Sequence, residues 1–155
     1  MQIKDFISEE GIVFSPSVSS KKAALEMLSD TVSYQDSNLS KGKVLDGLLA
    51  REKLGSTGLG EGIAIPHCRI QELDNIYIAM LKLEEGVEYD ASDDKPVFFL
   101  FCLVVPEDSN DEHLELLANL AELLDNELLR KSIQKSSNAR ELYQILTQDP
   151  KHLAA

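Results

Sequence analysis

The sequence predicts an α/β sandwich, a sheet covered by helices on both faces, formed by a single domain over residues 1–155 with its core at about 3–147. Segments of strand and helix character alternate along the chain, which is typical of this fold class. The segment 97–105 is apolar at every position, as expected for a central strand buried on both faces. The length suits one ordinary domain, and no linker, repeat or low-complexity tract divides it.

The N-terminal third is predicted to contain one short strand and two helices. Residues 12–14, Ile-Val-Phe, form the strand, which ends at a Ser-Pro turn because proline has no N–H for a sheet ladder. Apolar residues at helical spacing predict a helix over 21–32, with Ser19 or Ser20 as its N-cap. A second helix is predicted from 44 to about 54 and ends at Gly55, a common signal for a helix C-terminus.

The middle of the chain is predicted to supply three further strands. They cover 63–67, 76–83 and 97–105, and a polar turn at 90–95 precedes the last of them. Side chains alternate between the two faces of a strand. We therefore expect His67 to lie on the same face as Ile63 and Ile65, and opposite to Ala64 and Cys68.

The C-terminal part is predicted to be helical. Ser109 and Glu112 form a capping box, which places His113 in the first turn of the helix that follows. The expected buried stripe of this helix consists of Leu114, Leu117, Leu120, Ala121 and Leu124. A short helix is predicted over 128–133, and Asn138 with Glu141 repeats the capping pattern before a last helix.

The charge of the chain argues against two kinds of binding partner. With 27 acidic against 15 basic residues, the net charge is −12, which disfavours binding to nucleic acid or to an anionic membrane.

The N-terminus lacks the pattern of a signal peptide, and the longest apolar run, 97–105, is too short to span a bilayer. We expect a cytoplasmic protein whose cysteines stay reduced.

A glycine-rich segment followed by a histidine is the best candidate for a functional site. Four glycines lie within 55–62, and the segment continues as Ile63-Ala-Ile-Pro-His67. Glycine permits positive φ angles and close approach of backbone N–H groups, which in a turn form an anion-binding nest. A neutral imidazole has a lone pair that can attack phosphorus, so His67 is the candidate nucleophile. Donors for phosphoryl oxygens are available nearby, from Arg51, Ser56, Thr57 and Gly58.

Two other kinds of site fail on the letters of the sequence. A nucleotide-binding P-loop needs a lysine followed by serine or threonine after its last glycine, but Gly60 is followed by Glu61-Gly62. A structural zinc site needs closely spaced ligand pairs, but Cys68 and Cys102 are 34 positions apart. The sequence predicts neither a metal nor a cofactor, and both cysteines are expected to be buried small hydrophobic residues.

The segments Arg51-Glu52, Leu54-Gly-Ser-Thr-Gly58 and Gly62-Ile-Ala-Ile-Pro-His67 resemble the phosphorylation-site signature of the fructose/mannitol class of enzyme IIA. This family belongs to the bacterial phosphoenolpyruvate-dependent phosphotransferase system (PTS), and the wording most resembles its nitrogen-regulatory type. The resemblance covers nearly the whole chain and implies a central mixed sheet. It implies that His67 accepts a phosphoryl group from a histidine phosphocarrier protein of the HPr type, with Arg51 at the site.

The resemblance also implies a second histidine at the site. In the family this histidine lies in a His-Leu-x-x-Leu context, which here is the segment that begins at His113. Its implied role is to hydrogen-bond the active imidazole or the phosphoryl group. At the start of a helix, His113 would otherwise be an ordinary surface residue, and Arg51 would otherwise complement a helix dipole.

Three functions remain open from the sequence. The first is a regulatory phosphocarrier, in which phosphorylation of His67 decides which protein the surface binds. The second is a component of sugar uptake that passes phosphate to a IIB domain. The third, a binding protein that has lost phosphoryl transfer, is disfavoured because His67, Arg51 and His113 are all present. The resemblance of the signature to that of the nitrogen-regulatory type favours the first function.

Overall fold

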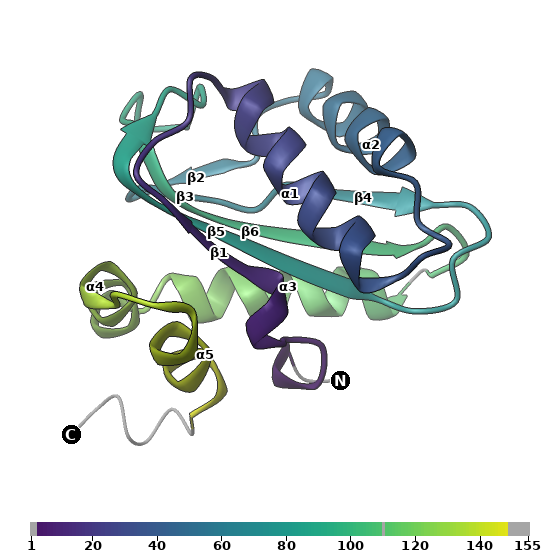
Figure 1. Cartoon of the computed structure of the whole chain (residues 1–155). Helices are drawn as coiled ribbons and strands as arrows, with labels where there is room; N and C mark the ends of the chain where they lie inside the picture. Colours follow the sequence, from purple (N-terminus) through teal and green to yellow (C-terminus); the bar gives the residue numbers. More distant parts are fainter. Residues whose placement is uncertain (1–2, 110, 149–155) are drawn as a thin grey trace.

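One mixed sheet lies between two layers of helices in the computed structural model, which describes residues 3–109 and 111–148 apart from the side chains of 111 and 112 (Figure 1). The strands are β1 (Ile12–Ser15), β2 (Gly58–Gly60), β3 (Ile63–Ala64), β4 (His67–Ile70), β5 (Tyr77–Val87) and β6 (Val97–Pro106). Their order is β1–β5–β6–β3–β2, and β4 also pairs with β6. Only β5–β6 and β2–β3 are antiparallel among these pairs. The predicted α/β sandwich and its mixed sheet are confirmed.

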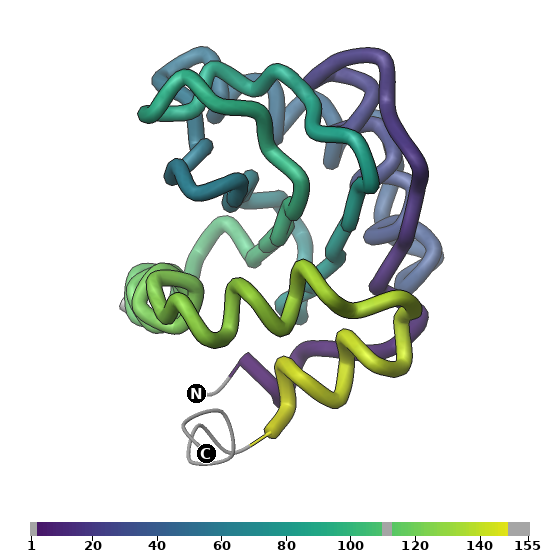
Figure 2. The backbone as a smooth tube through the Cα atoms, turned by 90° about the vertical axis from the view of Figure 1, so that its left-hand side faces the viewer, coloured from purple at the N-terminus to yellow at the C-terminus, as the bar shows by residue number. Residues whose placement is uncertain are grey.

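The helices divide between the two faces of the sheet. They are α1 (Lys21–Gln35), α2 (Lys41–Lys53), α3 (Asp111–Leu124), α4 (Glu127–Lys135) and α5 (Ala139–Thr147), preceded by 3-10 turns at Ile3–Asp5 and Glu9–Gly11. Helices α1 and α2 pack on one face and α3, α4 and α5 on the other, and each face has its own apolar core (Figures 1 and 2). No helix in the described part of the chain is long and apolar enough to cross a membrane.

The fully apolar segment forms the central strand β6, as predicted. It pairs with β5 on one side and with β3 and β4 on the other. Its side chains enter both cores alternately, Leu100 and Cys102 towards α1 and α2, Phe101 and Leu103 towards α3. Burial on both faces explains why this strand shows no polar alternation in the sequence.

The predicted strand 63–67 is wrong in its extent, because two strands share this segment. Strand β3 ends at Ala64, and β4 begins at His67. Pro66 has no N–H to donate to a ladder, although its carbonyl accepts a bond from Leu103 N–H. The predicted alternation of faces survives the break, since Ile65 lies in the core beside α3 and Cys68 in the opposite core.

Serine and asparagine caps set the starts of four helices. The side chains of Ser20, Ser40, Asn126 and Asn138 each accept a backbone N–H three residues ahead. Helix α1 therefore starts where predicted but continues to Gln35. Helix α2 starts three residues before the predicted position because Ser40 caps it.

The buried face of α3 differs from the predicted stripe. Leu114 is 62% exposed, whereas His113 is only 4% exposed and lies in line with buried Leu116, Leu120 and Leu124. The expectation for Leu114 is wrong because a histidine occupies the helical position that continues the apolar face. The capping box lies partly outside the described residues, since the helix starts at Asp111 and the Glu112 side chain is not described.

Candidate functional site

The ring of His67 is oriented by a backbone carbonyl. His67 is the first residue of β4, and its Nδ1 lies 2.9 Å from the Ile65 carbonyl oxygen. A carbonyl can only accept, so we assign the proton of the neutral ring to Nδ1. The lone pair of the ring is then on Nε2.

The guanidinium of Arg51 faces that lone pair. Arg51 lies in the last turn of α2, and its Nε lies 3.3 Å from Nε2 of His67. Its Nη1 donates to the Gly55 carbonyl at 2.9 Å, which fixes the guanidinium between the helix end and the glycine segment. A cationic donor is therefore already in place where phosphoryl oxygens on Nε2 would lie.

The surroundings of His67 favour the neutral ring. Burial lowers its pKa, the bond to the Ile65 carbonyl partly opposes this, and the charge of Arg51 lowers the pKa further. The result lies below the ordinary value of 6.5. His67 is therefore neutral at neutral pH, the state in which Nε2 is nucleophilic.

His113, near the start of α3, lies beside His67. The two ring centroids are 5.8 Å apart with an interplanar angle of 65°. Burial, with smaller contributions from the charges of Arg69 and His67, lowers the pKa of His113 to about 4. Its Nδ1 is buried and has no hydrogen-bond partner among the described residues.

Ser56, Thr57 and Gly58 are hydrogen-bonded within the glycine segment and to its neighbours. The Ser56 hydroxyl donates to the Tyr89 carbonyl at 2.9 Å and accepts from Gly58 N–H at 3.1 Å. The Thr57 hydroxyl donates to Glu52 and lies 3.2 Å from the Tyr89 hydroxyl. The structure thus brings His67, Arg51 and His113 together. The polar groups of the glycine segment instead form hydrogen bonds to Tyr89, to Glu52 and to one another.

Glu52 belongs to the signature in the sequence, but sequence reasoning gave its carboxylate no role at the site. It accepts bonds from Thr57 N–H at 3.1 Å, from the Tyr89 hydroxyl at 3.0 Å and from the Lys21 ammonium at 2.8 Å. Burial raises its pKa, but the bonds from Lys21 and Thr57 outweigh this, and the pKa is lowered. Glu52 therefore stays ionised and ties the glycine segment to α2, next to Arg51. Only its position beside Arg51 was visible in the sequence, because Tyr89 lies 37 residues away.

Two glycines of the segment are required by its geometry. Gly62 has a φ of 78°, in the left-handed region that favours glycine. At Gly58 a Cβ atom would lie 2.8 Å from the Ala91 backbone, so the segment can approach residue 91 only without a side chain.

The described part of the chain contains no metal site. No group of three or more histidine, cysteine or acidic side chains among the described residues could hold a metal ion. Cys68 and Cys102 are buried, and burial raises the pKa of the Cys68 thiol to about 12. A thiol with this pKa stays protonated and is a poor nucleophile.

The half-buried imidazole of His67, the guanidinium of Arg51 and the second histidine, His113, thus form one cluster, and the comparisons with known proteins give the family of the chain. The family model described as phosphoenolpyruvate-dependent sugar phosphotransferase system, EIIA 2, matches residues 5–149. The chain belongs to this family, and the resemblance seen in the signature is confirmed.

The relatives include proteins with nitrogen-regulatory names and a protein with a fructose-specific name. The chain is similar to the nitrogen regulatory protein of Pseudomonas aeruginosa, with 43% identity over 127 residues that cover 82% of each chain. It is also similar to the fructose-specific EIIA component of Haloferax volcanii, with 31% identity over 83% of each chain. The crystal structure of the nitrogen regulatory protein IIA-Ntr from Neisseria meningitidis superposes with a TM-score of 0.87 at 41% identity, over 94% of this chain and 99% of that one.

Proposed function

We propose that the chain is a phosphohistidine carrier, in which Nε2 of His67 accepts a phosphoryl group from an HPr-type histidine phosphocarrier protein. The bond between His67 Nδ1–H and the Ile65 carbonyl carries this proposal, because it leaves the lone pair on Nε2, facing Arg51. The N–P bond to Nε2 forms as the N–P bond of the carrier breaks, and the electron pair of that bond returns to the carrier. His67 keeps its Nδ1 proton, so its phosphorylated ring is an imidazolium and no general base is required at His67. The carrier ring carries a proton on its other nitrogen when it donates the phosphoryl group, and it therefore leaves as a neutral imidazole.

Arg51 and His113 would stabilise the transferred group. Once Nε2 is phosphorylated, Arg51 Nε–H loses its acceptor on the ring and donates to a phosphoryl oxygen instead. For His113 we assign the proton to Nε2, because an N–H at the unpartnered, buried Nδ1 would have no acceptor. The hydrogen bonds of Ser56, Thr57 and Gly58 support a role in shaping the segment around the phosphoryl group.

The proposed role of the transfer is regulation. The nitrogen-regulatory names of the relatives support this role. In it, a cytoplasmic single-domain protein would bind protein targets according to the state of His67. Large apolar side chains are exposed on the elements that carry the site, at Leu54, Leu59 and Leu114. A phosphoryl group among them would alter docking through its charge and its desolvation cost.

A sugar-uptake role is the second candidate, favoured by the fructose-specific relative. The chemistry at His67 would be the same, but the phosphoryl group would pass to a IIB domain. Transfer from the phosphorylated chain to a purified IIB domain at a rate that matches its labelling would support uptake. Labelling without such transfer would support regulation.

The assignment is tested by labelling in the presence of phosphoenolpyruvate, enzyme I and the carrier. Intact-mass measurement should show one added phosphate that is lost in acid. His67→Ala should abolish the added mass, and His152→Ala, a change at the third histidine of the chain, should leave it unchanged. Acid-labile label that persists on His67→Ala would reject the proposal.

A further inference from the structure

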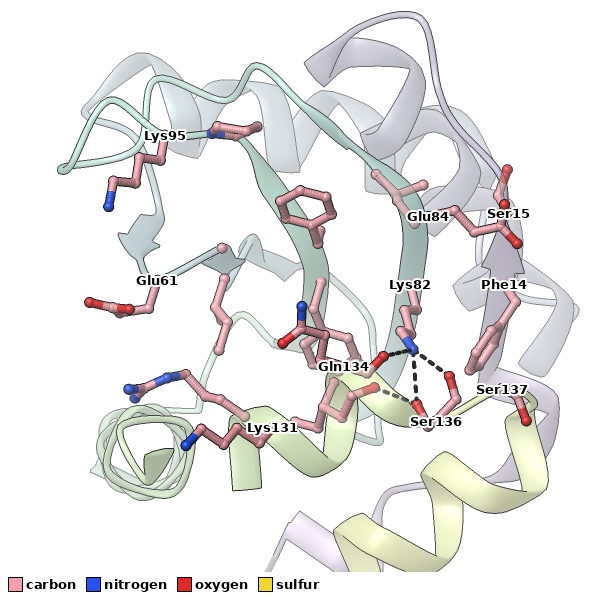
Figure 3. Close-up of a pocket in the computed structure, with 18 of the residues that line it drawn as sticks. Phe14, Ser15, Glu61, Lys82, Glu84, Lys95, Lys131, Gln134, Ser136 and Ser137 are labelled. Carbon is pink, nitrogen blue, oxygen red and sulfur yellow. Dashed lines mark hydrogen bonds between the residues drawn. The ribbon is translucent and has the colours of Figure 1, made fainter. Parts of the chain in front are cut away.

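A cavity of about 960 Å³ lies between the sheet and α4 (Figure 3). Its lining does not include Arg51, His67 or His113. Small-molecule pockets in proteins have volumes of ~300–1,000 Å³. The cavity is therefore large enough for a metabolite-sized ligand at a place distinct from the candidate phosphotransfer site.

Part of the cavity wall is aromatic and held in place. Phe14, Phe98 and Phe99 line it, and Phe98 is 41% exposed. A Cβ atom at Gly86 would lie 2.9 Å from the Phe98 ring, and one at Gly62 would lie 3.4 Å from it. The lack of side chains at both glycines thus makes room for this ring, which offers an apolar surface to a ligand.

Arg130 supplies a guanidinium that is already fixed at the cavity. Its side chain is only 20% exposed, and its Nη1 donates to the carbonyls of Leu124 at 3.2 Å and Asp125 at 2.7 Å. Nη1 also lies 3.9 Å from the highly exposed Asp125 carboxylate, so among the described residues the contacts found for this guanidinium are all made by Nη1. A guanidinium has five N–H donors, so the edge formed by Nε and Nη2 is left for another acceptor. Little side-chain entropy remains to be lost when an anion binds there.

The other charged groups of the lining balance one another, so that Arg130 adds the one positive charge in excess. The basic residues are Lys82, Lys95, Arg130 and Lys131, and the acidic residues are Glu61, Glu84 and Glu127. Lys82 is engaged with the carbonyls of Gln134 and Ser136, while Lys131 pairs with Glu127 at 3.4 Å. The lining has four basic groups against three acidic ones, and the solvent-screened carboxylate of Asp125 lies 3.9 Å from Arg130 outside the lining. This near balance contrasts with the net charge of −12 of the whole chain. The cavity is thus a place where this acidic protein can accept an anion.

We propose that this cavity binds a small organic anion, whose carboxylate or phosphate lies on Arg130 and whose apolar body lies against Phe98 and Phe99. The planar guanidinium matches both kinds of anion through two parallel hydrogen bonds. The inference does not depend on phosphoryl transfer, because none of its residues belongs to the site around His67.

The proposal is tested by fluorescence titration with three probes. Anilinonaphthalene sulfonate combines an anion with an aromatic body, N-phenylnaphthylamine has the body without the charge, and inorganic phosphate has the charge without the body. We expect saturable 1:1 binding of the sulfonate, with about tenfold weaker binding of the neutral probe and weak competition by phosphate. Amide NMR shifts caused by the sulfonate should cluster at Gly62, Phe98 and Gln134.

Matched arginine variants locate the anion. Arg130→Gln should weaken binding of the sulfonate about tenfold, whereas Arg140→Gln, the same change at an exposed residue of α5 outside the lining, should leave it within about twofold. Lys131→Gln, at an exposed position, should weaken binding about threefold and remains informative if Arg130→Gln fails to fold. Equal effects of Arg130→Gln and Arg140→Gln, equal binding of the neutral probe, or shifts centred on His67 would each overturn the proposal.

Discussion

The chemistry of the site depends on which nitrogen of His67 carries the proton. The Ile65 carbonyl holds the proton on Nδ1, and Arg51 faces Nε2. Because burial and Arg51 keep the ring neutral, the nucleophile needs no activation step. A single backbone carbonyl therefore sets both the orientation of the ring and the nitrogen that would react in the proposed transfer.

The burial of His113 predicts a dependence of stability on pH. Its pKa is about 4 in the folded chain and about 6.5 when unfolded, so the unfolded chain binds more protons between these values. The free energy of unfolding should therefore fall as the pH is lowered from 7 to 5, and on the order of 1 kcal/mol of this fall should disappear in His113→Phe. Urea titrations at both pH values measure it. A fall of the same size in both proteins would contradict the buried neutral state.

Glu52 is predicted to act on phosphoryl transfer through Arg51. Glu52→Gln places an amide opposite the donors of Thr57 and removes the charge that pairs with Lys21, at a cost of about 1–3 kcal/mol in stability. Labelling of His67 should slow about tenfold, but the same change in an Arg51→Ala background should slow it no further. Thr57→Val removes the hydroxyl that bonds to Glu52, and Thr57→Ser, which keeps that hydroxyl, is its control. Additive losses in the double variant would show that Glu52 acts independently.

At the scale of elements, the candidate site lies where the end of one helix meets the starts of a strand and of a second helix. Helix α2 ends beside the glycine segment, β4 begins at His67, and α3 starts close to His113. Each position is set by local chemistry, such as the missing N–H of Pro66 and the positive φ of Gly62. The residues of the candidate site therefore lie on regular helices and strands, and the glycine segment connects α2 to the strands that follow.

A matched pair of glycine substitutions tests the close approach of this segment. Gly58→Ala places a Cβ atom 2.8 Å from the Ala91 backbone and should cost about 1–3 kcal/mol of stability. Gly42→Ala lies in the first turn of α2, where a Cβ would meet nothing closer than 3.6 Å, and should gain about 0.5–1 kcal/mol. Thermal unfolding of both variants measures whether each substitution lowers or raises the stability. Stabilisation by Gly58→Ala would contradict the packing at Ala91.

Sequence periodicity predicted those elements whose apolar pattern is unambiguous. It located β6 because the strand is apolar on both faces, and it located α5 because Asn138 with Glu141 marks its start. It failed at Leu114, since the position that continues the buried face of α3 is filled by a histidine. It also could not find the network around Glu52, because Tyr89 reaches that carboxylate from a distant part of the chain.

At the scale of the whole molecule, the fold places two layers of helices on one mixed sheet. Alternation of strand and helix segments predicted this architecture, and the apolar segment 97–105 predicted its centre. The pairing of β4 with β6 and the order of the strands depend on contacts between distant residues, which no local pattern contains. The meeting of Arg51, His67 and His113 was therefore expected only through the resemblance to a family.

The net charge of −12 predicts electrostatic attraction between this protein and a basic surface on the proposed carrier. A basic partner is steered by long-range attraction, which weakens when salt shortens the Debye length to about 10 Å or less. Raising the ionic strength from about 0.02 M to about 0.2 M should therefore lower kcat/KM for labelling about three- to tenfold while kcat changes little. Stopped labelling reactions at several salt concentrations measure both. A rate independent of salt would contradict electrostatic steering.

The central claim is that Nε2 of His67 is the atom that carries the phosphoryl group. The most direct test is ¹⁵N and ³¹P NMR of the histidine-labelled protein after phosphorylation by the carrier. The account predicts a phosphorus bonded to Nε2 of His67, with the proton retained on Nδ1. A phosphoryl group on Nδ1, or on any other side chain, would contradict it.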